Sequence, residues 1–121
     1  MNYESTRTIE SNVAPGVQFE IRRMSFGRRL EFTKLVRQLG QKLEFLEAGV
    51  TPTEKLEAAL VTAEINRVYL GWGLAGVTGL TIDGMPADAV TVTSDGPEDL
   101  CREILAAIKH ECGLTDEERK N

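Results

Sequence analysis

Apolar residues recur at helical spacing between residues 25 and 49 and predict a long helix. They follow one another at intervals of three and four, which places them along one face: Phe32, Val36, Leu39, Leu43 and Leu46. Ser25 is a suitable N-cap and Gly49 a suitable left-handed stop, so the helix is expected to end at about Ala48. Such a seam is suited to packing along a second helix.

A local capping signal predicts where that second helix begins. In Thr51-Pro52-Thr53-Glu54, an N-cap hydroxyl precedes a proline at the first helical position and a glutamate at the third. The helix is expected to run to about Tyr69 or Trp72 and to use these apolar positions: Leu56, Leu60, Ala63, Ile65, Val68, Tyr69 and Trp72. Because a short loop joins the two helices, we expect an antiparallel hairpin.

Two shorter segments have the alternation of a strand. Val17, Phe19 and Ile21 alternate with polar residues, which is typical of a strand with one buried face. Asp83-Gly84 is a strong hairpin turn, preceded by a brief strand at 80–82 and followed by a return segment in which Val90 and Val92 alternate. We expect this hairpin to form a small sheet beside the helices, with the 17–22 strand as a candidate third member.

A third helix is expected to start at Asp95-Gly96-Pro97-Glu98 and to run to about Cys112, with Gly113 as its stop. Its expected buried positions are Leu100, Ile104, Leu105, Ala107 and Ile108. Residues 115–118 could cap one last turn. The predicted fold is α+β and mainly helical, with three main helices and a small antiparallel sheet or hairpin. Residues 1–16 are expected to be a flexible lead-in and 17–121 a single α-rich globular domain.

Composition and charge narrow the class of function. The 121 residues are 41% hydrophobic and 27% charged, which is ordinary for a globular protein. The net charge of −5 argues against nucleic-acid binding, although 22–42 carries seven basic residues against one acidic residue. That basic segment and the acidic second half can attract each other within one fold or between copies. Charges interrupt every apolar stretch, so no transmembrane helix is expected, and 1–11 lacks the apolar core of a secretory signal.

The residues that usually carry chemistry are few. His110 is the one histidine, and Cys112 lies two positions away, where two helical side chains do not meet. Cys101 and Cys112 are about 16 Å apart along one helix, too far for a disulfide, so they are expected to be reduced thiols of a cytosolic protein. The carboxylates lie where helix starts and exposed faces explain them. We therefore expect no enzyme activity, no metal and no cofactor.

Three segments resemble the tail assembly chaperones of long-tailed (siphovirus-like) bacteriophages and prophages. They are 67–84 (RVYLGWGLAGVTGLTIDG), 96–108 (GPEDLCREILAAI) and 114–121 (LTDEERKN). The resemblance covers about the last 55 residues, and the first half agrees only in size and helical character. It implies a non-enzymatic protein of the host bacterial cytoplasm. Its partners would be the phage tape-measure protein and the tail-tube protein, with a homo-oligomer as an option.

Other readings remain open at this point. A structural phage tail or head–tail joining protein of the virion is the first alternative, and a small enzyme or ligand-binding module is the second. The second would need a deep pocket with two or more convergent titratable groups. Six residues are candidates for protein contact or for the core: Phe32, Val36, Leu39, Leu43, Tyr69 and Trp72. For Tyr69 and Trp72 the core is favoured over an interface anchor.

Overall fold

The structure is a computed structural model that describes residues 1–113; residues 114–121, with the predicted last cap, lie outside this description. The described chain forms helices α1 (Phe26–Glu47), α2 (Pro52–Gly73), α3 (Ala89–Asp95) and α4 (Glu98–Cys112). Its strands are β1 (Thr6–Glu10), β2 (Gln18–Arg22), β3 (Leu74–Thr78), β4 (Thr81–Ile82) and β5 (Met85–Pro86). The predicted α+β, mainly helical class is confirmed.

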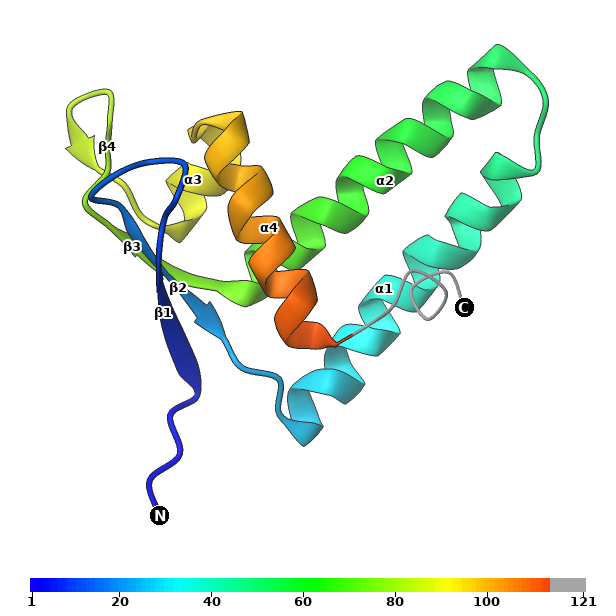
Figure 1. The fold of residues 1–121 in the computed structure, drawn as a ribbon. Coiled ribbons are helices and arrows are strands. Elements are labelled where there is room, and N and C mark those ends of the chain that lie inside the picture. The colour runs from blue at the N-terminus through cyan, green and yellow to red at the C-terminus, as the bar shows by residue number, and fades with distance from the viewer. Residues whose placement is uncertain (114–121) are drawn as a thin grey trace.

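The elements form a body and a projecting arm (Figure 1). The body contains an antiparallel sheet in the order β1-β2-β3, the small β4-β5 hairpin, α3 and α4. The arm is the antiparallel pair α1 and α2, which leaves the body as a long helical hairpin. Helix α4 lies between the sheet and the base of this arm, where it packs against both β2 and α2.

The core is built around one face of α4. Leu100, Ile104, Ile108 and Cys112 recur every fourth residue, and each is 0–1% exposed. They meet the buried side chains of the body strands and of the arm's base: Val17, Phe19, Ile21, Phe32, Val36, Tyr69, Leu70 and Leu74. Full burial of one such large apolar side chain contributes about 1.5–3 kcal/mol. A second, smaller cluster of Leu46, Ala58 and Val61 holds the outer part of the arm together.

Several local signals in the sequence fold as predicted. The side chains of Ser25 and Thr51 accept hydrogen bonds from the backbone N–H groups of Arg28 and Glu54 and so cap α1 and α2. Gly113 ends α4 in the left-handed conformation with φ of 67°. Asp83 and Gly84 have φ of 51° and 80°, as the predicted hairpin turn requires.

Other expectations are wrong, because tertiary contacts or a competing cap decide the structure. The lead-in predicted over 1–16 contains β1, which pairs with β2. The β4-β5 hairpin forms its own sheet, and β2 pairs with β1 and β3 instead. The segment 89–95 is helical, because Asp88 and Thr91 form a reciprocal capping box; Val92 is buried while Val90 is exposed. Gly49 is not left-handed, and Ala48 caps α1 in the right-handed helical region.

A side chain of α4 also fixes the turn between β1 and β2. Both carboxylate oxygens of Glu103 accept hydrogen bonds from this turn, one from Ser11 Oγ at 2.5 Å and one from the backbone N–H of Asn12 at 2.8 Å. Ser11 Oγ in turn accepts hydrogen bonds from the backbone N–H groups of Val13 and Ala14. The first two strands are therefore held to α4 by polar contacts as well as by the apolar core.

The central position of α4 can be tested by shortening a core side chain. Ile104→Ala should lower the free energy of unfolding by about 3 kcal/mol, because it removes fully buried methyl and methylene groups and leaves a cavity. Val90→Ala is the matched control: Val90 is 74% exposed, and the expected change is below about 0.5 kcal/mol. Urea unfolding monitored by circular dichroism measures both variants. A loss for Ile104→Ala no larger than that of the control would contradict the described core.

Candidate protein-contact site

The six residues singled out in the sequence lie inside the arm and at its base. Phe32 and Tyr69 are fully buried, and their rings meet edge to face with centroids 4.7 Å apart. The Trp72 ring is half-buried, with its centroid 4.6 Å from that of Phe32. Val36 is buried, and Leu39 and Leu43 are partly buried between the two helices. These side chains therefore hold the hairpin together, which agrees with the core alternative.

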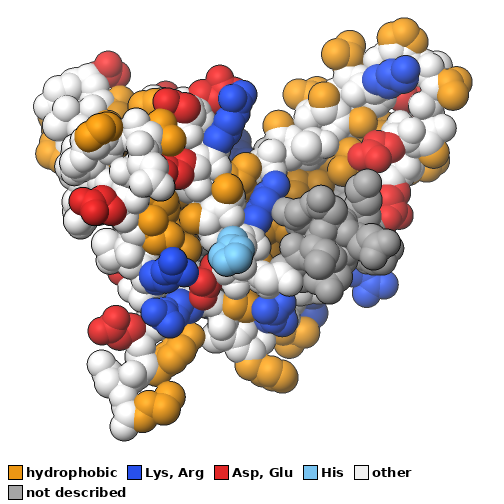
Figure 2. All heavy atoms as spheres, in the orientation of Figure 1, with side chains coloured by type: hydrophobic (Ala, Val, Ile, Leu, Met, Phe, Trp, Pro, Cys, Tyr) orange, Lys and Arg blue, Asp and Glu red, His pale blue; other side chains and the backbone are white. Residues whose placement is uncertain are grey.

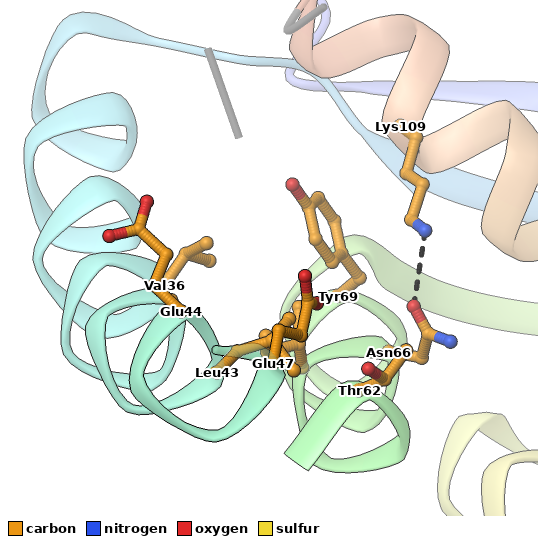
Figure 3. A pocket seen from close by; sticks show the side chains of 10 residues that line it. Val36, Leu43, Glu44, Glu47, Thr62, Asn66, Tyr69 and Lys109 are labelled. Carbon is orange, nitrogen blue, oxygen red and sulfur yellow. Dashed lines mark hydrogen bonds between the residues drawn. The ribbon is translucent and has the colours of Figure 1, made fainter. Parts of the chain in front are cut away.

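Three of these residues also line a groove between α1 and α2, hereafter the arm groove (Figure 3). It has a volume of about 370 Å³, and one residue of α4 stands at its end near the body. Its lining is Val36, Gly40, Leu43, Glu44, Glu47, Thr62, Ile65, Asn66, Tyr69 and Lys109. Aliphatic side chains form much of the lining, with polar groups on both walls. A groove of this size is within the range of protein pockets that hold a compact ligand or several side chains.

The polar groups of the arm groove are arranged unequally. On the body side, Lys109 Nζ donates a hydrogen bond to Asn66 Oδ1 at 3.1 Å and lies 5.3 Å from the centroid of the Tyr69 ring, a cation–π contact (Figure 3). On α1, Glu44 and Glu47 are exposed, and neither carboxylate takes part in an ion pair within residues 1–113. Among the described residues, the groove thus has a lysine at one end and two carboxylates along the α1 wall.

A second surface lies on the outside of α2 and was not predicted. Leu56 and Leu60, expected to be buried, are 69% and 65% exposed, and Ala59 and Ala63 beside them are exposed too. These four residues share one helical face, hereafter the outer stripe. Figure 2 shows apolar side chains on the projecting arm. The sequence does not show which face of α2 is buried, because apolar residues occur around much of the helix circumference. In the structure Ala58 and Val61 form the buried face.

The outer stripe leads toward a shallow hollow of about 220 Å³ between α2 and α3. Arg67, Leu70 and Gly71 contribute to it from α2, and Ala89 and Val90 from α3. Val90 is 74% exposed, so this apolar side chain extends the surface from the arm onto the body. Exposed apolar residues that gather on one face of a soluble domain are typical of protein-contact sites.

Two side chains, Asp88 and Cys101, have shifted pKa values, and both have structural roles. The pKa of Asp88 is lowered chiefly because its carboxylate accepts a hydrogen bond from the backbone N–H of Thr91 in the α3 cap. Burial raises the pKa of the Cys101 thiol, and the nearby carboxylates of Asp99 and Glu98 raise it further. Cys101 Sγ donates to the carbonyl of Val92 at 3.2 Å. A raised thiol pKa is the opposite of what an activated nucleophile needs.

Neither similarity to known proteins nor a metal-binding cluster indicates a function for the described surfaces. Comparison with protein-family models, curated proteins and solved structures finds no match to this chain. In the described part of the chain, no three His, Cys, Asp or Glu side chains group together as metal ligands would. Over the same residues, no helix is both long and apolar enough to cross a bilayer.

The environment of the two thiols predicts their reactivity. At pH 7.5, iodoacetamide should modify Cys101 several-fold more slowly than free cysteine, because its raised pKa lowers the thiolate fraction, and the rate should rise steeply above pH 9. Cys112 is 1% exposed and should react only on unfolding. Mass spectrometry of labelled peptides over time measures both, with the protein in urea as the control. A Cys101 rate equal to that of free cysteine at pH 7.5 would contradict the described environment.

Proposed function

We propose that this protein is a non-enzymatic phage tail assembly chaperone. In this proposal it binds the tape-measure protein in the bacterial cytoplasm and aids assembly of the tail tube. The resemblance of 67–84, 96–108 and 114–121 to such chaperones suggests the client. The structural observation that carries the proposal is the outer stripe on α2, where Leu56 and Leu60 are more than half exposed on a projecting helix.

An exposed apolar helical face suits a helical client. The outer stripe can lie along the apolar face of a client helix in the manner of helix-in-groove recognition, with anchors one turn apart. Full burial of one leucine contributes about 1.5–3 kcal/mol, so two leucines and their alanine neighbours support a weak contact for each copy. Many copies along one long client would gain strength through multivalency. Weak single contacts also allow release when the client is assembled.

Enzyme activity receives less support from the same surfaces. The arm groove does hold Glu44, Glu47 and Lys109, but both carboxylates are exposed and the lysine ammonium is held by Asn66 and the Tyr69 ring. An acid–base pair for catalysis needs side chains that converge on one reacting atom. A virion tail or head–tail joining protein would also expose apolar surfaces, so that alternative is separated by experiment.

A double substitution on the outer stripe tests the proposal. Wild-type protein co-expressed with the tape-measure protein should copurify with it and keep it soluble. Leu56→Glu/Leu60→Glu should reduce the copurified client at least about tenfold, because two charges replace the apolar contacts. Both leucines are exposed, so the fold should survive, and circular dichroism checks this.

Gln38→Glu/Gln41→Glu is the matched control, since it adds the same charge at two exposed positions of α1. This variant should bind the client as the wild type does. The proposal fails if wild-type protein neither binds nor solubilises the tape-measure protein. It is replaced by the structural alternative if purified virions contain the chain at a fixed copy number.

A further inference from the structure

The α1 wall of the arm groove carries two carboxylates that no cation of residues 1–113 pairs with. Glu44 and Glu47 are three residues apart, so they are neighbours on one face of the helix, where like charges repel. Both lie in the last turn of α1, which contains no basic residue. The carbonyl end of a helix is itself partially negative and favours cations. Three sources of negative potential therefore act at the same place.

Beside these carboxylates the groove is apolar. Val36 and Leu43 of α1 and Ile65 of α2 line it. The Thr62 hydroxyl donates to the carbonyl of Ala58 at 3.0 Å, so it is already engaged within its own helix. An occupant that matches this lining has an aliphatic group with a cation a short distance away, as in leucine followed one helical turn later by lysine or arginine.

We propose that the arm groove binds an amphipathic helical segment of the client protein whose large aliphatic side chain enters the groove and whose lysine or arginine meets Glu44 and Glu47. This inference rests on the proposed function in that the segment belongs to the chaperone's client. The carboxylates lie in the last turn of α1, near the tip of the arm, so the cation of the bound segment is directed there.

The charge of the groove distinguishes it from the outer stripe. Both signs of charge border the stripe, Lys55 and Arg67 as well as Glu57 and Glu64, so it selects chiefly apolar surface. The α1 wall of the arm groove carries carboxylates alone, so the groove selects apolar surface combined with positive charge. A client helix without basic residues would bind only the stripe. The two surfaces therefore have different effects on binding. The stripe gives affinity for apolar helices in general, and the groove gives selectivity for those that carry a basic residue.

Two synthetic helical peptides serve as probes of the groove. Both have 18 residues and the same single stripe of leucines, and they differ in carrying lysine or glutamate beside that stripe. Fluorescence anisotropy at physiological salt measures their binding to the full chain. We expect the lysine peptide to bind at least tenfold more tightly than the glutamate peptide. Glu44→Gln/Glu47→Gln should reduce lysine-peptide affinity about tenfold and leave the glutamate peptide no weaker.

Matched controls separate a built groove from a generally acidic surface. Glu4→Gln/Glu10→Gln removes the same charge from exposed positions of the body, away from both the arm groove and the outer stripe, and should leave binding unchanged. Thr62→Phe fills the groove from an exposed position and should weaken lysine-peptide binding at least fivefold. Gln41→Phe adds the same ring at an exposed site of α1 outside the groove and should have no such effect.

The proposal is overturned if the Glu4/Glu10 variant loses as much binding as the Glu44/Glu47 variant, or if Thr62→Phe binds like the wild type. Analytical ultracentrifugation compares the wild type with the Glu44→Gln/Glu47→Gln variant. If the wild type self-associates and the variant does not, the groove binds a second copy of the chain and the proposal is equally overturned. If wild-type protein copurifies with the tape-measure protein but does not discriminate between the peptides, the groove proposal alone fails. If it discriminates but does not bind the tape-measure protein, the proposed function fails and the groove's preference stands.

Discussion

The close packing of α4 against the end of α2 is the contact on which the rest of the structure depends. A Cβ atom at Gly73 would lie 2.5 Å from Ile108 Cγ2, a distance that no packed side chain tolerates. Glycine therefore lets the last turn of α2 touch α4 directly. Gly73 is followed without a loop by Leu74, which is 3% exposed and begins β3. One short segment thus fixes the arm, the sheet and α4 relative to one another.

Because the arm is held at its base, its outer half is free to present side chains. Arg29 Nη2 donates to the carbonyl of Cys112 at 3.1 Å, which satisfies one of the open carbonyls at the end of α4 and ties the start of α1 to it. Beyond Val36 and Tyr69 the hairpin is held by the small cluster of Leu46, Ala58 and Val61, against which the partly buried Leu39, Leu43 and Ile65 pack. Apolar side chains there exceed what two helices can bury between them, so some remain exposed.

The sequence predicts those features that depend on neighbouring residues and misses those that depend on distant ones. The Ser25 and Thr51 caps, the Asp83-Gly84 turn and the periodic α4 face each rest on a few adjacent positions. The pairing of β1 with β2 depends partly on Glu103, about ninety residues away, which holds their turn. The alternation of apolar and polar residues from Val17 to Ile21 predicts a strand, but it does not predict which strands pair with it. For α2, the apolar pattern fits either face, and only the position of α1 decides which leucines are buried.

The charged residues of the arm oppose association through its exposed leucines. A domain that exposes leucines on a projecting helix risks association with its own copies. On α2, Glu57 and Glu64 are exposed near the outer stripe, and on α1, Lys34, Arg37 and Lys42 are exposed along the same arm. Charged groups near exposed apolar side chains favour solvation of the arm. Part of the basic segment 22–42 therefore lies exposed on the arm, where it favours solvation of the helices. The basic segment needs no nucleic-acid partner to explain it.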